Sequence, residues 1–120
     1  MVRSAEEFKK RTKLFALRII RLADSLPKTM AGRHIGGQLL RSGTSVGSNY
    51  RAACRARSPA EFCAKLGIVE EEADESIYWM ELLIEGKLMK EHLLGSLLKE
   101  ANEILAMVIA SITTARRKKR

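Results

Sequence analysis

A predicted helix carries a stripe of arginines with small and hydroxyl residues between them. At about 100° of rotation per residue, seven residues share an arc of about 80°: Arg33, Gly37, Arg41, Thr44, Ser48, Arg51 and Arg55. Guanidinium groups pair well with phosphate oxygens, hydroxyls add hydrogen bonds, and glycine permits close approach of a backbone. The stripe therefore indicates binding to a phosphate backbone.

A second interpretation pairs these arginines with an acidic segment further along the chain. That segment contains Glu70, Glu71, Glu72, Asp74, Glu75, Glu81 and Glu85. Exposed ion pairs of this kind contribute about 0–1 kcal/mol each. The two interpretations are compatible, because the segments on either side keep surplus positive charge.

The net charge of +8 is unevenly distributed along the chain. Residues 1–58 hold 13 Lys/Arg against 3 Asp/Glu, residues 59–89 hold 2 against 8, and residues 90–120 hold 7 against 3. Besides the stripe, the candidate nucleic-acid-binding cations are Lys10, Arg11, Arg18, Arg21, Arg116, Arg117, Lys118 and Lys119. Segregated positive charge favours a polyanionic partner.

Residue patterns for catalysis or metal binding are missing from the sequence. His34 and His92 are isolated, and Cys54 and Cys63 form no C-x-x-C pair. The acidic run lacks the Glu-x-x-His spacing of dimetal bundles, and no nucleophile motif occurs. We therefore expect no enzyme activity, no metal and no cofactor. Short apolar runs and a charged start predict a cytoplasmic protein without a membrane span.

Four amphipathic helices are predicted to position these residues, over about 5–26, 31–57, 59–86 and 91–116. Ser4 with Glu7, and Ser58 with Glu61, have capping-box spacing. Pro27 and Gly86 are expected to end the first and third helices. Short connections place successive helices antiparallel. The sequence thus predicts an all-α, up-down-up-down four-helix bundle as a single domain over 1–120, with a basic tail at 116–120.

The predicted core consists of one apolar stripe per helix. In chain order the stripes are Phe8, Thr12, Phe15, Ile19, Leu22 and Leu26; Ile35, Leu39, Val46, Tyr50 and Ala53; Phe62, Leu66, Val69, Ala73, Ile77, Met80 and Ile84; and Leu94, Leu98, Ala101, Leu105, Val108 and Ile112.

Glycines are unusually frequent in the helix predicted over 31–57. Each costs about 0.5–1 kcal/mol in a helix interior, but the apolar period favours a helix nonetheless. Gly36, Gly43, Gly47 and Cys54 form an edge of small residues beside the core stripe. This edge predicts close packing of another helix or, alternatively, direct contact with a ligand.

A second apolar face is predicted on the third helix. Ile68, Trp79 and Leu82 lie within about 60° of one another, away from the core stripe. Such a face indicates an oligomer interface. Alternatively, Trp79 closes the edge of its own bundle.

The segment from Arg33 to Leu83 resembles a known family. It contains QLLRSGTSVGSNYRAA from Gln38, RARS from Arg55, EEEADE from Glu70 and YWMELL from Tyr78. These motifs are similar to the bacterial four helix bundle protein family, which includes proteins encoded within intervening sequences of 23S ribosomal RNA genes. A more distant similarity is to the accessory variability determinant proteins of diversity-generating retroelements. The resemblance implies a ring-like homopentamer and, through the distant branch, binding of nucleic acid and a reverse transcriptase.

These observations together predict a non-catalytic, oligomeric nucleic-acid-binding protein. RNA is expected more than DNA, with recognition of the backbone, because Phe, Tyr and Trp make up only 5% of residues. The alternative is a protein-interaction scaffold, or an accessory subunit of a reverse-transcriptase or other ribonucleoprotein complex.

Overall fold

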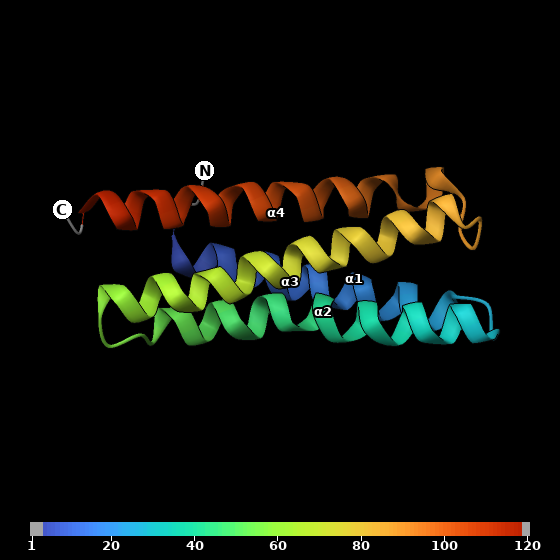
Figure 1. Cartoon of the computed structure of the whole chain (residues 1–120), viewed down its shortest axis with the longest axis horizontal. Helices are drawn as coiled ribbons and strands as arrows, with labels where there is room; N and C mark the ends of the chain where they lie inside the picture. The colour runs from blue at the N-terminus through green and yellow to red at the C-terminus, as the bar shows by residue number, and fades with distance from the viewer. Residues whose placement is uncertain (1–3, 119–120) are drawn as a thin grey trace.

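Four antiparallel helices make up the computed structural model, which describes residues 4–118. They are α1 (Ala5–Ser25), α2 (Met30–Cys54), α3 (Pro59–Glu85) and α4 (Glu91–Lys118). No strand occurs within this range, and the bundle measures 49 × 22 × 21 Å (Figure 1). The predicted all-α four-helix architecture is confirmed. Lys119, predicted to bind nucleic acid, lies outside the described residues.

Side-chain caps explain where three of the helices begin. Ser4 Oγ accepts a hydrogen bond from the backbone N–H of Glu7 at 3.0 Å, and Ser58 Oγ accepts one from Glu61 at 3.1 Å. Such caps satisfy backbone donors that the first turn leaves unpaired. Thr29 caps α2 in the same way, which was not predicted.

Two helix ends differ from the prediction. The helix predicted over 31–57 ends at Cys54, because the chain must turn before the Ser58 cap of α3. Conversely, α4 continues to Lys118, two residues past its predicted end.

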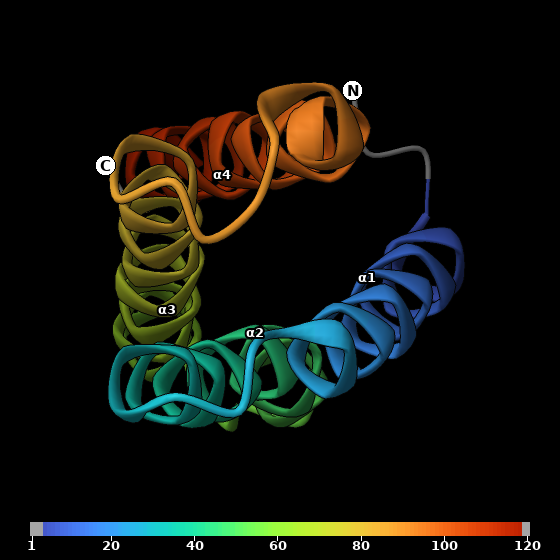
Figure 2. The same ribbon diagram turned by 90° about the vertical axis from the view of Figure 1, so that its right-hand side faces the viewer.

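The helices follow one another around the four corners of the bundle (Figure 2). Each packs mainly against its neighbours in sequence, and α1 meets α4 over far fewer residues. With 21 residues, α1 is also the shortest helix. In Figure 1 it begins short of the end that α4 and the α2–α3 connection reach.

The core lies along the inner faces of all four helices. Every stripe residue predicted on the first two helices is buried, as are most of those on the other two. Four predicted core residues are only half-buried: Phe62, Ile84, Leu98 and Leu105. Three large apolar side chains that were not predicted in the core are buried: Leu83, Leu97 and Ile104. On α4 the buried residues differ from the predicted stripe because the buried arc is turned toward the side of the helix that faces α1.

Candidate nucleic-acid interface

Glycines bring α2 into close contact with α1 and so set its rotation. A Cβ on Gly43 would lie 2.7 Å from Ile19 Cγ1, and one on Gly47 would lie 3.2 Å from Thr12 Oγ1. The close packing predicted for this edge is confirmed. We call Gly36, Gly43 and Gly47 with their α1 neighbours the glycine seam. Because this edge faces α1, the arginine stripe is turned toward the outside.

Arg41, in the middle of the stripe, binds α3. Its guanidinium donates to Glu72 Oε2 at 2.9 Å and also to Glu75. Trp79 Nε1 donates to the same Glu75 carboxylate at 3.0 Å. The hydrogen bond to Glu75 raises the pKa of Arg41, while the bonds from Trp79 and then Arg41 lower the pKa of Glu75. The ion-pair interpretation therefore holds for Arg41.

A buried hydroxyl pair lies beside this ion-pair cluster. Ser42 and Ser76 are fully buried, and their hydroxyls lie 2.9 Å apart in a hydrogen bond. Buried polar groups are stabilising only when partnered. This pair therefore favours one rotation of α2 against α3.

Two of the predicted cations on α1 bind α4. The Arg11 guanidinium donates to both carboxylate oxygens of Glu100, at 2.8 and 2.7 Å, and to Glu103 at 2.7 Å. The hydrogen bond to Glu100 is the main cause of a raised pKa at Arg11. Arg18 donates to Ser96 Oγ at 3.0 Å. Pairing with acids on α4 was not among the predicted alternatives. We call these contacts the arginine-bridged seam.

The remaining predicted cations are exposed. They are Lys10, Arg21, Arg33, Arg51, Arg55, Arg116, Arg117 and Lys118. Within residues 4–118 none of them takes part in an ion pair. The stripe is not continuous, since Arg33 lies about 27 Å along α2 from Arg51 at 1.5 Å per residue and Arg41 is committed to α3.

The antiparallel fold gathers two distant basic segments at one end of the bundle. The end of α2 supplies Arg51 and Arg55, and the end of α4 supplies Arg116, Arg117 and Lys118 (Figure 1). Arg57, in the α2–α3 connection, is exposed at the same end. Arg57 was not a predicted site residue. Its position between the second and third predicted helices could have indicated it, because an antiparallel bundle places that connection at the same end as the end of the fourth helix. We call these six residues the basic end.

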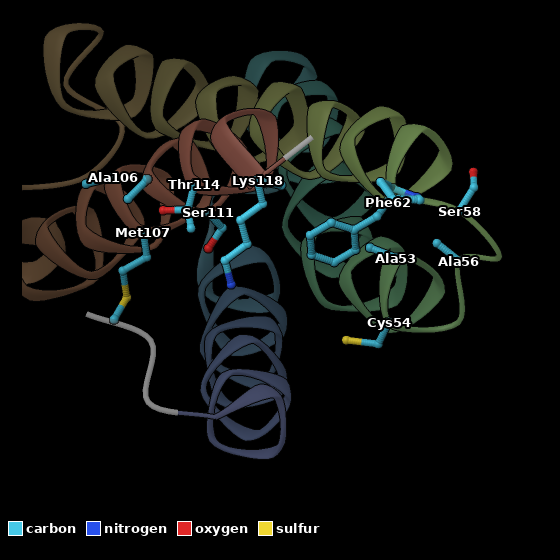
Figure 3. Close-up of a pocket in the computed structure, with 13 residues that line it drawn as sticks. Ala53, Cys54, Ala56, Ser58, Phe62, Ala106, Met107, Ser111, Thr114 and Lys118 are labelled. Atoms are coloured by element: carbon cyan, nitrogen blue, oxygen red, sulfur yellow. The ribbon is translucent and has the colours of Figure 1, made fainter. Parts of the chain in front are cut away.

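A groove of about 770 Å³ opens beside the basic end. Small residues of α4 line one side of it, and the end of α2 and start of α3 line the other. Figure 3 shows the Phe62 ring projecting into the groove, with Cys54 and Lys118 also among its lining residues. The groove opens where the shorter α1 does not extend.

The three residues predicted as an oligomer interface differ in exposure. Ile68 is 41% exposed, whereas Trp79 and Leu82 are half-buried against the core. Trp79 also contacts the His34 ring edge-on, with centroids 5.9 Å apart. It therefore helps to close the edge between α2 and α3. Tyr78, 53% exposed, is the most exposed of the three aromatic residues of this helix.

Comparison with known proteins agrees with this architecture. Residues 6–110 match the family described as 23S rRNA-intervening sequence protein. The chain belongs to this family. A crystal structure of a protein of unknown function from the S23 ribosomal protein family of Bacteroides thetaiotaomicron is 36% identical. The match covers 91% of this chain and 97% of that one, with a TM-score of 0.84. None of the curated proteins matches the chain.

The family match ends before the basic residues at the end of α4, so Arg116, Arg117 and Lys118 lie beyond it. Among residues 4–118, no three potential metal-ligating side chains of His, Cys, Asp or Glu cluster together. Over the same range, no helix is both long and apolar enough to span a membrane.

Proposed function

We propose that this protein is a non-catalytic, oligomeric nucleic-acid-binding protein that holds RNA at the basic end. The observation that carries the proposal is the set of six exposed cations gathered there from α2, the α2–α3 connection and α4. Cations near helix C-termini also stabilise those termini, by about 0.3–1 kcal/mol each. That role leaves their charged groups accessible to phosphates.

The groove supports single-stranded RNA over a duplex. Unpaired bases stack on aromatic rings, with a contribution of about 1–3 kcal/mol per base. Phe62 and Lys118 both line the open groove, so the groove offers a nucleotide an aromatic ring as well as a cation. Exposed aromatics are otherwise few, which favours recognition of the backbone with little sequence preference.

The test is fluorescence anisotropy of a labelled single-stranded RNA and a matched DNA duplex, titrated with protein between 50 and 200 mM salt. The variant carries Arg51→Gln, Arg55→Gln and Arg57→Gln. If each arginine contacts one phosphate, the slope of log K against log salt falls by about 2 for single-stranded RNA. Phe62→Leu is expected to weaken RNA binding at all salt concentrations, with the slope unchanged.

A matched control removes the same charge from the opposite end of the bundle. Lys28, Lys87 and Lys90 are exposed there, in the two connections at that end, and their replacement by Gln should leave the slope nearly unchanged. Equal losses in the two triple variants, or no RNA binding at 50 mM salt, would contradict the proposal. A stoichiometric protein recovered from the host without RNA would instead support the scaffold role, with a reverse transcriptase or other ribonucleoprotein as partner.

The binding form in this proposal is a homo-oligomer. The family resemblance implies a ring of five subunits, and a ring would repeat the basic end around one axis and multiply its contacts with a single RNA. Sedimentation equilibrium of the full chain should then give about five times the 13.4 kDa mass of one subunit.

A further inference from the structure

Beside the basic end, α4 extends beyond the start of α1. Arg11 contacts Glu103 of α4, so Ala5, which comes earlier on α1, lies level with about residue 109 of the antiparallel α4. From there α4 continues to Lys118, over about 14 Å at 1.5 Å per residue. Among residues 4–118, no helix lies beside this length of α4 in the position that α1 holds further along the bundle (Figure 1). The groove lies there.

The two helix faces that pack against α1 continue into the groove. On α2, Cys54 lies two turns after Gly47 of the glycine seam, on the same side of the helix. On α4, Ser111 lies one turn after Met107, whose sulfur accepts a hydrogen bond from Arg11. Cys54, Met107 and Ser111 all line the groove. The groove therefore exposes the same two faces that hold a helix elsewhere in the bundle.

The lining of the groove suits a helix by its shape. Most of its side chains are small, among them Ala53, Ala56, Ala106, Ala110, Ser111 and Ala115. Small side chains let the axes of two helices approach closely, as they do at the glycine seam. Phe62 and Met107 add larger apolar surfaces on opposite walls (Figure 3). Amphipathic helices bind such grooves through apolar residues spaced three and four apart.

The surroundings of the groove are positively charged. Lys118 lines it, and Arg51 lies one turn after Gly47 and is exposed. Exposed acids at the starts of α1 and α3 and on the neighbouring turn of α4 are fewer than the six cations of the basic end: Glu6, Glu7, Glu61 and Glu103. Two of these acids are already paired, Glu6 with Lys9 and Glu103 with Arg11. Charge complementarity therefore favours an acidic occupant.

We infer that the groove binds a short amphipathic helix of another protein, in which Asp and Glu flank the apolar stripe. The helix would lie beside α4 in line with α1, cover Phe62, and bring its acids to Arg51 and Lys118. The inference rests on the proposed function in one respect, because this ring and these cations are the ones assigned to RNA. The helix and RNA therefore compete, and the partner regulates RNA binding.

The test selects peptides displayed on phage, with the full chain as the target. The library varies every position of peptides of about 14 residues, which span about 21 Å as helices. Enriched peptides are expected to carry apolar residues at steps of three and four, with Asp or Glu on both sides. The peptide that is enriched most is then labelled and titrated with the protein, and its helical content should rise on binding.

Two tryptophan variants show whether the peptide binds in the groove. Ala110→Trp fills the groove from an exposed lining position, and Thr113→Trp places the same ring on the same helix outside the lining. Affinity for the peptide should fall at least about tenfold in the first and less than about twofold in the second. Circular dichroism melting confirms that both variants are folded.

Competition with RNA tests the regulatory part of the inference. Unlabelled peptide should displace labelled single-stranded RNA from the wild type. A version with Asn and Gln in place of Asp and Glu should displace it far less, because the charge complementarity is lost. A version with Pro at its centre should not displace it, because proline breaks the helix.

Three results would overturn the inference. They are a selection that yields no acidic helical peptide sensitive to Ala110→Trp, a groove-bound peptide that leaves RNA in place, and a wild-type oligomer that Ala110→Trp dissociates, which would assign the groove to a second copy of this chain. RNA binding with the expected salt dependence, together with a failed selection, would overturn this inference alone. Groove-dependent peptides on a protein that binds no RNA at low salt would overturn the proposed function alone.

Discussion

The two flanks of α1 are built in different ways. At the glycine seam the helices approach so closely that Gly43 leaves no room for a methyl group beside Ile19. At the arginine-bridged seam, Arg11 and Arg18 span to α4 with long side chains. Packing of the first kind depends on shape and tolerates little change. Bridging of the second kind depends on charge, and flexible side chains can adjust.

The largest expected effect of a substitution is at the glycine seam. Gly43→Ala should lower the free energy of unfolding by about 1–3 kcal/mol, because the added Cβ forces Ile19 or the helices to move. The measurement is urea denaturation followed by circular dichroism. Gly37→Ala is the matched control, since a Cβ there meets nothing within 4 Å. It should stabilise by up to about 1 kcal/mol, and equal losses in both variants would show that helix packing is not the cause.

A smaller effect is expected at the arginine-bridged seam. Arg11→Ala removes a two-pronged contact with a carboxylate that is only 22% exposed, and should cost about 1–2 kcal/mol. Arg11→Lys should recover less than half of this, because an ammonium cannot reproduce the fork. Lys13→Ala, on the exposed side of the same helix, is the control and should change stability by less than about 0.5 kcal/mol.

The contact between α2 and α3 combines a buried hydroxyl pair, Ser42 with Ser76, and the ion pairs of Arg41. Its contribution to stability should depend on pH. The pKa of Glu75 is lowered, so its contribution to stability is complete above the ordinary carboxyl pKa of 4.5 and is lost as pH falls through the lowered value. Glu75→Gln should therefore be less stable than wild type at pH 7. The difference should shrink below pH 4.5 in thermal denaturation. A gap that stays constant down to pH 3 would contradict this assignment.

The smallest effect should come from Arg18. Its single hydrogen bond to Ser96 is exposed, and Arg18→Ala should change the free energy of unfolding by less than about 0.5 kcal/mol. A loss as large as that of Arg11→Ala would indicate that the whole seam acts as one network. The double variant would measure that coupling directly.

The helices could be predicted from the sequence because the capping residues and the apolar period indicate the same elements. Ser4 and Ser58 cap helices as predicted, and the apolar period correctly outweighed the glycines of α2. The rotation of α4 about its own axis was harder to predict from the sequence. Leu97 and Leu98 differ by one step of the helix, and only the position of α1 decides which of them is buried.

For the candidate site, the sequence was sufficient to find the cations and the acidic partners of Arg41, but not the α4 partners of Arg11 and Arg18. The stripe was predicted to meet either phosphates or the acidic segment, and Arg41 binds Glu72 and Glu75 of that segment while Arg51 and Arg55 remain exposed. Glu100 was not considered for Arg11, because acids of only one helix were weighed. The basic end arises from packing segments about 60 residues apart, which no local pattern reveals.

The sparse contact between α1 and α4 bears on how the chain acquires its structure. Almost every interhelical contact joins consecutive helices, so each helical hairpin can form before the chain ends meet. Topologies dominated by such local contacts fold in microseconds to milliseconds. Arg11 and Arg18 would then make their contacts with α4 last, after the consecutive helices have paired. Their seam should also be the first to open in the native protein, and backbone amides along α1 should exchange with solvent sooner than those of α2 and α3.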